Sequence, residues 1–267
     1  MVKIAVAGAR GRMGGRIAAL SREYEGVELA GAFEQKGHAD AGKDMGSLLG
    51  VSGLDVKLSD NIEAVLDNAR VVIDFTQPAS TLKNLRACAA KGRAMVIGTT
   101  GFSKEDLEEV RGLTSGIPCV MASNMSTGIN LLLKVIRDIA RVLGDEYDIE
   151  IIEAHHRYKK DAPSGTALRL AEAAAEGVER NLDDVAVYAR KGIIGERTRT
   201  EIGIQTVRAG DIVGEHTVLF GGLGERIEVT HRASSRDTFA RGALRAAMWI
   251  EGKKPGLYDM QDVLGLK

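Results

Sequence analysis

The stretch VKIAVAGARGRMGG, residues 2–15, decides the fold of the first half of this chain. Its apolar run, Val2–Gly8, has the composition of a buried strand, and an amphipathic segment with helical spacing follows the turn. Between them glycines recur at every third position, at Gly8, Gly11 and Gly14. This spacing is a variant of the dinucleotide-binding fingerprint, in which a tight turn brings a pyrophosphate close to free N–H groups at a helix start. A plain strand-to-helix connector can also be glycine-rich, so the pattern needs independent support.

A carboxylate at the end of the next strand gives that support. The run Val27–Glu34 is predicted as a strand, and Glu34 stands about 20 residues beyond the glycine turn, where an acidic side chain accepts hydrogen bonds from the adenosine ribose hydroxyls. The charge of Glu34 would repel the 2′-phosphate of NADP, whereas Lys36 could partly neutralise that phosphate. We therefore expect NADH as the preferred cofactor, with NADPH as a second one that is tolerated.

The rest of the first half alternates apolar runs with helical patterns. Strand-like runs occupy Val71–Phe75, Ala94–Thr100 and Ile117–Ser123, and helices are predicted at 78–92 and 103–113. The second of these helices starts with a capping box, a serine followed three residues later by an aspartate. Strands that are apolar on both faces and alternate with helices indicate a parallel sheet that is covered on both sides. We therefore predict an α/β fold with a Rossmann-type parallel sheet.

A different pattern begins with the long amphipathic helix predicted at Asn130–Gly144. Long alternating strands with glycine-rich turns follow, which indicates an open mixed or antiparallel sheet in a second, α+β layer. The last helix, Ser234–Gly252, precedes only a short tail and is expected to return to the first domain. The predicted organisation is a dinucleotide-binding domain over 1–126, an inserted substrate-binding and oligomerisation domain over 127–235, and a return to the first domain over 236–267.

Two later strand ends are further candidates for the cofactor site. The stretches GTTG, Gly98–Gly101, and ASNMSTG, Ala122–Gly128, follow predicted parallel strands at their carboxyl ends, where open α/β sheets bind ligands. Small and hydroxyl residues there would let a nicotinamide ring and a ribose approach the backbone. Loop and helix-cap chemistry is the alternative interpretation. We favour the functional one because the glycine turn and Glu34 already indicate a cofactor.

The stretch EAHHRYKKDAPSGTAL, residues 153–168, concentrates groups that carry protons. If the strand before it stays extended, His155 and Lys159 share one face while His156 points to the other. Adjacent histidines on opposite faces chelate poorly and no cysteine is near, so no metal site is expected. A histidine and a lysine on one face suit an anionic substrate that is protonated during the reaction.

The end of the same stretch indicates an anion site. Pro163 suits the start of a helix, where its missing N–H costs nothing, and Ser164, Gly165 and Thr166 then expose backbone donors. A carboxylate is the natural ligand for such a helix start. A solvated basic loop before a capped helix is the alternative, and we favour the functional interpretation because the segment accompanies a cofactor domain.

The bulk composition excludes several classes of protein. A formal net charge of −1 over 267 residues argues against a dedicated nucleic-acid binder. The two cysteines, Cys88 and Cys119, lie in apolar surroundings without metal-type spacing and are predicted to be buried thiols in a reducing cytosol. No signal peptide and no apolar run of about 18 residues are found. We therefore expect a cytoplasmic protein without a membrane partner.

Several motifs together make the chain recognisable. They are VAGARGRMG, VIDFTQP, IGTTGF, EAHHRYKKDAPSGTA, TVRAGDIVGEHTV and VTHRASSR, and they extend over nearly the whole sequence. In these motifs the chain closely resembles the 4-hydroxy-tetrahydrodipicolinate reductase (dihydrodipicolinate reductase) family of bacterial lysine and diaminopimelate synthesis. The EAHHRYKKDAPSGTA stretch is far more specific than the glycine turn. The resemblance implies an NAD(P)H-dependent oxidoreductase that closes its two domains around a dicarboxylate ring, and a homotetramer built by the second domain's sheet.

The resemblance also implies roles for single residues. His155 matches the family's proton donor and acceptor, and Lys159 its second proton donor. Substrate carboxylates would be bound at His156, Gly165 and Thr166. The matching cofactor contacts are Gly8, Ala9, Arg10, Gly11, Arg12, Met13, Glu34, Gly98, Thr99, Thr100, Ala122, Ser123, Asn124 and Met125.

One position departs from the family's pattern. Many members carry an arginine directly after the acidic residue, where it helps to hold the NADP phosphate, and here that position is Gln35. The departure agrees with the NADH preference expected from Glu34.

Two other functions are consistent with parts of the sequence. A semialdehyde-type or homoserine-dehydrogenase-like oxidoreductase would share the architecture, but a semialdehyde enzyme needs a catalytic cysteine, and neither Cys88 nor Cys119 is well placed. A non-catalytic dinucleotide sensor would keep the glycine turn and have no reason to retain His155 with Lys159. Polar residues of the later strands, Glu215, His216 and His231, are interpreted as structural, and Trp249 as core packing.

Overall fold

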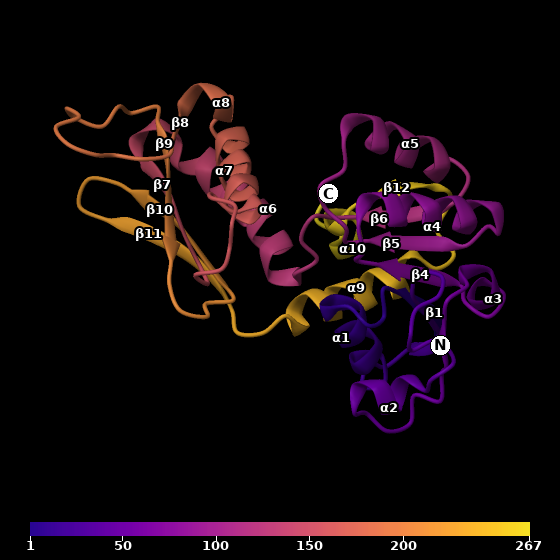
Figure 1. Ribbon diagram of the computed structural model, residues 1–267. Helices are drawn as coiled ribbons and strands as arrows, with labels where there is room; N and C mark the ends of the chain where they lie inside the picture. The colour runs from indigo at the N-terminus through magenta and orange to yellow at the C-terminus, as the bar shows by residue number, and fades with distance from the viewer. The chain divides into compact units, whose positions relative to one another are not determined.

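The structure is a computed structural model that describes residues 1–267. The chain forms two compact units, which are drawn together in Figure 1. The first comprises Met1–Thr127 and Asp237–Lys267, and the second Gly128–Arg236. None of the helices combines the length and the apolar character that crossing a bilayer requires.

The first unit contains a seven-stranded sheet in which every pair of neighbouring strands is parallel. The strand order is β12-β6-β5-β4-β1-β2-β3, so the chain moves outward in one direction from β1 to β3 and in the other from β4 onward. The strands are β1 (Val2–Ala7), β2 (Val27–Phe33), β3 (Leu58–Ser59), β4 (Val71–Asp74), β5 (Ala94–Ile97), β6 (Pro118–Met121) and β12 (Gly256–Tyr258). This arrangement confirms the predicted Rossmann-type sheet.

Helices cover both faces of this sheet (Figure 1). Along β4, Val71 and Ile73 pack into the apolar cluster on one face and Val72 into the cluster on the other, which explains why the strand is apolar throughout. One face carries α1 (Arg12–Ser21), α2 (Met45–Leu49), α9 (Asp237–Ile250) and α10 (Met260–Leu264). The other carries α3 (Ile62–Leu66), α4 (Pro78–Ala90) and α5 (Lys104–Thr114), the last with the predicted capping box of Ser103 and Asp106.

The segment after α9 is more ordered than a short tail. Residues Gly256–Tyr258 form β12, which pairs with the edge strand β6, and α10 follows with its own capping box between Asp259 and Asp262. The expectation of a plain tail was therefore wrong. A strand of three residues is too short to show a period in the sequence, and only its pairing with β6 defines it.

The second unit contains a five-stranded sheet with the order β11-β10-β7-β9-β8. Strand β10 is antiparallel to β7 and β11, whereas β9 is parallel to β7 and β8, so the sheet is mixed. The strands are β7 (Asp148–His155), β8 (Ala186–Val187), β9 (Ile202–Arg208), β10 (Gly214–Gly221) and β11 (Arg226–Ala233). The helices are α6 (Thr127–Leu143), the one-turn η1 (Gly144–Glu146), α7 (Gly165–Gly177) and α8 (Leu182–Val185).

Only one face of this sheet is packed against helices. Helices α6 and α7 share an apolar cluster with Ile149 and Ile151 of β7 and Val218 of β10, and they lie on the same side of the sheet in Figure 1. On the opposite face the side chains of Ile152 and Val207 are 39% and 45% exposed. Antiparallel strands with one solvated face produce the alternation seen in the sequence.

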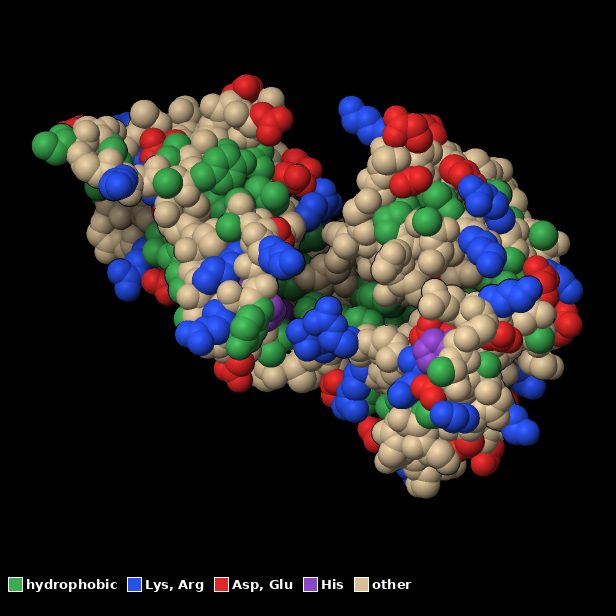
Figure 2. Space-filling model, viewed as in Figure 1, with side chains coloured by type: hydrophobic (Ala, Val, Ile, Leu, Met, Phe, Trp, Pro, Cys, Tyr) green, Lys and Arg blue, Asp and Glu red, His purple; other side chains and the backbone are tan.

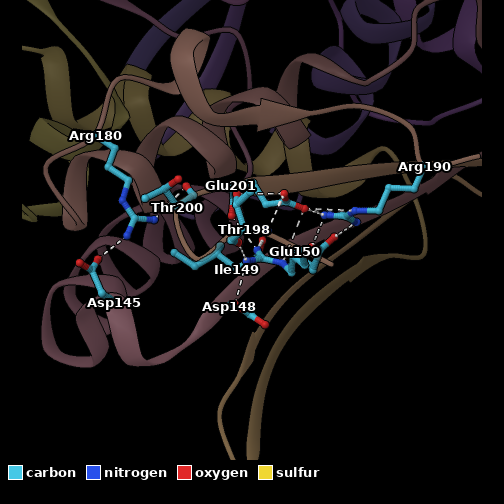
Figure 3. A network of polar contacts seen from close by, with 10 residues as sticks. Asp145, Asp148, Ile149, Glu150, Arg180, Arg190, Thr198, Thr200 and Glu201 are labelled. Carbon is cyan, nitrogen blue, oxygen red and sulfur yellow. Dashed lines mark hydrogen bonds and ion pairs between the residues drawn. The ribbon is translucent and has the colours of Figure 1, made fainter. Parts of the chain in front are cut away.

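A network of charged side chains anchors the segment between β8 and β9 (Figure 3). The guanidinium group of Arg190 donates to both carboxylate oxygens of Glu150, at 2.7 and 2.9 Å, and to Glu201 at 2.6 Å. Arg197 donates to Glu150 at 3.1 Å and to the backbone carbonyl of Glu201 at 2.6 Å. Gly203 leaves the space that the Glu150 carboxylate occupies, since a Cβ atom there would overlap it.

The Arg190→Ala variant should lower the free energy of unfolding by about 1–3 kcal/mol, because it removes charge-assisted hydrogen bonds to two partly buried carboxylates. Denaturant unfolding of the full chain measures the effect. The control is Arg111→Ala, which removes an exposed pair with Glu108 and should cost about 0.5 kcal/mol or less. Equal losses in the two variants would contradict the anchoring role.

Candidate active site

The glycine turn of the first unit has a backbone conformation that favours glycine. Gly8 has a φ of +60°, the left-handed region that side chains disfavour, and it follows the last residue of β1. A Cβ atom on Gly14 would overlap the carbonyl oxygen of Gly8, so the lack of a side chain at Gly14 lets α1 begin directly against the turn. No side chain caps α1 at Gly11. The turn therefore exposes backbone donors at the positive end of a helix dipole, which suits a pyrophosphate.

A cavity of about 340 Å³ opens beside this turn. It lies at the carboxyl ends of β1, β2 and β4, where the strand order changes direction between β1 and β4. This position is where open α/β sheets bind their ligands. The residues present fit the adenosine half of a dinucleotide, with two carboxylates and two lysines among them. The lining residues are Gly8, Gly11, Phe33, Glu34, Gln35, Lys36, Asp60, Ile62, Phe75, Thr76, Gln77, Ser80, Lys83 and Asn84.

Glu34 is held at the turn by the backbone. Its Oε1 accepts a hydrogen bond of 2.9 Å from the N–H of Arg10. The guanidinium group of Arg10 is bonded instead to Asp40, at 2.9 Å, and to the carbonyl of Leu48, at 3.1 Å. The ion pairs with Lys43 and then Arg10 hold the pKa of Asp40 below its usual range. Glu34 thus lines the cavity with one carboxylate oxygen already engaged.

The two other predicted cofactor segments have different local structures. Gly98 lies under the ring of Phe75, which a Cβ atom would overlap. The Thr99 hydroxyl is buried and lies 2.8 Å from that of Thr81, in a cluster that also bonds Asp74, whereas Thr100 is exposed. In the second segment Ala122 and Asn124 are half-buried and Ser123 is exposed, while Met125 is buried, with its carbonyl against Gly242 of α9.

In the second unit the sheet register brings the polar groups together. Glu153 of β7 pairs with Thr206 of β9 on one side and with His216 of β10 on the other. One step further along β7, on the same face, His155 pairs with Arg208. Residues that are more than fifty positions apart in the chain therefore lie side by side on the face that α7 covers.

The Glu153 carboxylate is the common partner of these groups. It has no exposed surface. It lies 2.6 Å from Nδ1 of His155, accepts two bonds of 2.8 Å from Arg208, and accepts one of 3.0 Å from the backbone N–H of Ser164. Burial alone would raise the pKa of Glu153, but the bonds from Arg208, His155 and Ser164 outweigh burial and lower it to about 2. The group is therefore a carboxylate at neutral pH.

Two histidines of this cluster remain mostly neutral. Burial lowers the pKa of His155, the Glu153 charge opposes that shift only in part, and Lys159 and Arg208 add to it. The ring of His216 stands edge-on to that of His155, with centroids 5.1 Å apart. Burial, with the neighbouring His155, lowers the pKa of His216 to about 3. A neutral imidazole beside a fixed carboxylate is suited to general acid–base chemistry.

The predicted pairing of His155 and Lys159 on one strand face was wrong in its geometry. Strand β7 ends at His155, and the chain turns, with the N–H of Lys159 bonded to the carbonyl of His156 at 3.1 Å. The Lys159 ammonium pairs with Asp161 at 2.8 Å. The three cations and the proline in RYKKDAPS do not continue the alternation of the strand, and hydrogen bonds and ion pairs of the loop replace it.

The helix start predicted as an anion site is formed by the chain. Ser164 is the N-cap of α7, with its hydroxyl accepting from the N–H of Ala167 at 3.1 Å, and Gly165 and Thr166 begin the helix. The same hydroxyl lies 3.1 Å from Nε2 of His216. The first turn of α7 is thereby tied to the histidine cluster, with its positive dipole end beside it.

Three members of the site were not identified from the sequence: Glu153, Arg208 and His216. Glu153 and His155 are two positions apart in one strand, so the alternation rule could have placed them on the same face. Arg208 and His216 could be found only from the strand register, because no local pattern links them to His155. The interpretation of His216 as merely structural was incomplete, since its ring contacts that of His155. No group of three or more acidic, cysteine or histidine side chains is arranged to hold a metal ion.

The fold and the two sites define a class of protein, a dinucleotide-binding oxidoreductase with a separate unit that carries acid–base groups. The comparisons identify the family. Residues 2–125 match the model described as dihydrodipicolinate reductase, N-terminus, and residues 128–264 match the model described as dihydrodipicolinate reductase, C-terminus. The chain belongs to the dihydrodipicolinate reductase family.

Individual relatives agree with this assignment. Proteins from Syntrophobacter fumaroxidans and Geotalea daltonii, both named 4-hydroxy-tetrahydrodipicolinate reductase, are 58% identical to the chain over 267 residues and cover 100% of each sequence. A solved structure described as dipicolinate-bound dihydrodipicolinate reductase from Paenisporosarcina sp. TG-14 is 26% identical, with a TM-score of 0.75, and covers 98% of both chains. The family recognised from the motifs is thus confirmed.

The depressed pKa of His216 predicts that acid destabilises the protein. The unfolded chain binds a proton at this histidine below a pH of about 6.5, whereas the folded chain keeps the histidine neutral down to about 3. The free energy of unfolding therefore keeps its full value above pH 6.5 and decreases as the pH falls toward 3. Between pH 7 and pH 5, His216→Gln should lose about 1–2 kcal/mol less free energy of unfolding than the unmodified chain. Denaturant unfolding at the two pH values measures this difference, and identical losses would contradict it.

Proposed function

We propose that the protein reduces 4-hydroxy-tetrahydrodipicolinate (dihydrodipicolinate) to tetrahydrodipicolinate, with a reduced pyridine nucleotide, in lysine and diaminopimelate synthesis. The observation that carries the proposal is the buried Glu153 with His155 beside the first turn of α7, in a chain that also has the glycine turn and its cavity. Membership of the family and the names of full-length relatives support the reaction.

The residues of the second unit have defined tasks in this proposal. The protonated form of His155 donates from Nε2 the proton that the substrate needs and becomes neutral, because its Nδ1 is held by Glu153. Lys159 is the second proton donor, and its positive charge stabilises the negative charge that develops on the substrate ring as hydride arrives. The first turn of α7, Gly165 and Thr166, with His156, binds the substrate carboxylates through N–H groups and the helix dipole. The bound nicotinamide supplies the hydride.

The proposed substrate is chemically consistent with a solved relative. The description of the Paenisporosarcina structure states that it has dipicolinate bound. Dipicolinate is a ring with two carboxylates, the feature that the α7 helix start and its neighbouring cations suit. A dinucleotide sensor, in contrast, would not need a buried carboxylate to hold a histidine.

Removal of the proton donor should abolish turnover without loss of cofactor binding. His155→Gln should lower kcat by about a hundredfold or more, because general acid catalysis contributes at least that much. Lys159→Met should have an effect of about tenfold to a hundredfold. Oxidation of NADH at 340 nm measures turnover, and quenching of NADH fluorescence measures binding.

Lys160→Met, an exposed neighbour in the same loop, is the matched control and should keep its activity. If His155→Gln and Lys159→Met both turned over normally, the reductase site would not lie here. If the unmodified protein bound NADH but reduced no ring, the sensor interpretation would replace the reductase.

We also propose that NADH is preferred over NADPH. Glu34 lines the cavity with its position fixed by Arg10, and Gln35 stands where an arginine would hold the phosphate. The cations nearest by, Lys36 and Lys83, line the same cavity and favour some use of NADPH. The charge of Glu34 would therefore favour NADH, and the two lysines would reduce the size of this preference.

The preference should appear as a ratio of kcat/KM for NADH to NADPH of about tenfold, which corresponds to about 1.4 kcal/mol. Glu34→Gln should shrink this ratio, because it removes the repulsion of the 2′-phosphate, while Lys36→Met should enlarge it. Initial rates with each cofactor measure both effects. A faster reaction with NADPH in the unmodified protein would contradict the preference and leave the reductase assignment intact.

The remaining proposals concern assembly and location. Four copies are proposed to associate through the second unit's sheet, whose uncovered face exposes Ile152 and Val207 and would gain from burial. A cytoplasmic location is proposed because both cysteines are buried as free thiols, and burial raises the pKa of Cys88 to about 12, which keeps it unreactive.

A further inference from the structure

We infer that Glu153 is a positioning residue, which fixes the tautomer and the orientation of His155 and holds it at a set place relative to both the α7 helix start and the Lys159 loop. This inference rests on the proposed function, because it assumes that His155 transfers a proton. Glu153 would act only through other groups and would touch no substrate atom.

Hydrogen bonds hold the Glu153 carboxylate on both of its oxygens. Arg208 grips it with two parallel hydrogen bonds of 2.8 Å, the fork geometry that binds carboxylates most firmly. The Ser164 N–H and the Thr206 hydroxyl donate to Oε1 at 3.0 and 3.3 Å, and Nδ1 of His155 lies at Oε2. The Glu153 side chain is completely buried.

The Glu153 carboxylate selects one tautomer of His155. An ionised carboxylate only accepts hydrogen bonds, so Nδ1 of His155, 2.6 Å away, must carry the proton. In the neutral ring Nε2 is then the lone-pair atom, and it becomes the N–H donor when the ring is protonated. Glu153 therefore decides which nitrogen exchanges the proton with the substrate.

Neighbouring residues also hold the orientation of the His155 ring. A Cβ atom on Gly214 would stand 3.1 Å from Nε2 of His155, so the glycine leaves room for the ring edge. The ring of His216 stands edge-on at a centroid distance of 5.1 Å. With Glu153 at Nδ1, the imidazole is bounded on several sides and has one defined orientation.

The same cluster is also connected to Lys159, the proposed second proton donor. Beyond its bonds to Glu153, Arg208 donates to the backbone carbonyl of Asp161 at 2.7 Å, and Asp161 is the ion-pair partner of Lys159. The pair of Glu153 and Arg208 is thus bonded to His155, to the cap of α7, and to the loop that presents Lys159. A change at Glu153 would reach all three.

The test is the Glu153→Gln variant of the full chain. If the amide nitrogen takes the place of Oε2, it donates to Nδ1 of His155 and moves the ring proton to Nε2. The uncharged amide also no longer stabilises the protonated ring that donates to the substrate. We therefore expect kcat to fall by about a hundredfold, while the Kd for NADH stays unchanged and KM for the ring substrate changes less than kcat. The matched control is Glu150→Gln on the same strand, which also loses an arginine fork and should lose stability but keep kcat.

The pH profile gives a second readout that loss of stability alone would not move. The charged and titratable groups that face His155 are Glu153 on its own strand, Arg208 on β9, His216 on β10 and Lys159 in the loop. Only Glu153 favours the protonated ring, so its neutralisation lowers the pKa of His155. The alkaline limb of kcat, where the proton donor is lost, should therefore move to lower pH in Glu153→Gln and stay in place in Glu150→Gln.

A third readout needs no variant at position 153 to fold. The chain has five histidines, and ¹⁵N spectra of histidine-labelled protein, with His155→Gln to assign the signal, show which ring nitrogen carries the proton. We expect Nδ1–H for His155 at neutral pH. A neutral His155 with its proton on Nε2 would overturn the inference.

The outcomes separate this inference from the proposed function. An active His155→Gln would refute the catalytic role of His155 and with it the proposed site. An inactive His155→Gln together with a Glu153→Gln variant of unchanged kcat and unchanged pH profile would refute the positioning role alone.

Discussion

The structure of the second unit depends on one buried carboxylate. A charged group without contact to water is stable only if hydrogen bonds replace its hydration, since the penalty for an unpaired ion is several kcal/mol. Glu153 meets this requirement with donors from two strands and a helix cap: Arg208 and Thr206 on β9, His155 on β7, and Ser164 at the start of α7. The same bonds that make its burial possible also fix the groups proposed for catalysis, so stability and site geometry have one origin.

In the first unit the glycine turn offers backbone N–H groups, rather than side chains, to a ligand. A positive φ at Gly8 and the absence of a Cβ atom at Gly14 bring the carbonyl of the turn against α1 and leave the helix start open. Side chains enter only at the edge of the cavity, where Glu34 and the lysines would distinguish one cofactor from another. The two units therefore use different chemistry, with helix and backbone dipoles in one and a compensated charge cluster in the other.

The sequence predicted what depends on local signals. The glycine spacing, the doubly apolar strands and the capping box at Ser103 each lie within a few residues, and the structure contains all three. The prediction from sequence was wrong where long-range contacts determine the structure. Strand β12 is defined by its pairing with β6, and the loop after His155 turns because Lys159 pairs with Asp161 and Arg208 donates to the carbonyl of Asp161. The partnership of Arg208 and His216 with His155 needed the register of three strands. Glu153 was the exception, a residue that the alternation of β7 could have revealed.

The proposed reaction is the delivery of hydride from a nicotinamide to a dicarboxylate ring. The most direct test is to incubate the protein with NADH deuterated at both C4 positions and with the ring substrate, which the condensation of pyruvate with aspartate semialdehyde generates in place. Mass spectrometry of the product then follows the label. The account predicts tetrahydrodipicolinate that carries one deuterium from the cofactor. NADH that binds but leaves the ring unlabelled and unreduced would contradict it.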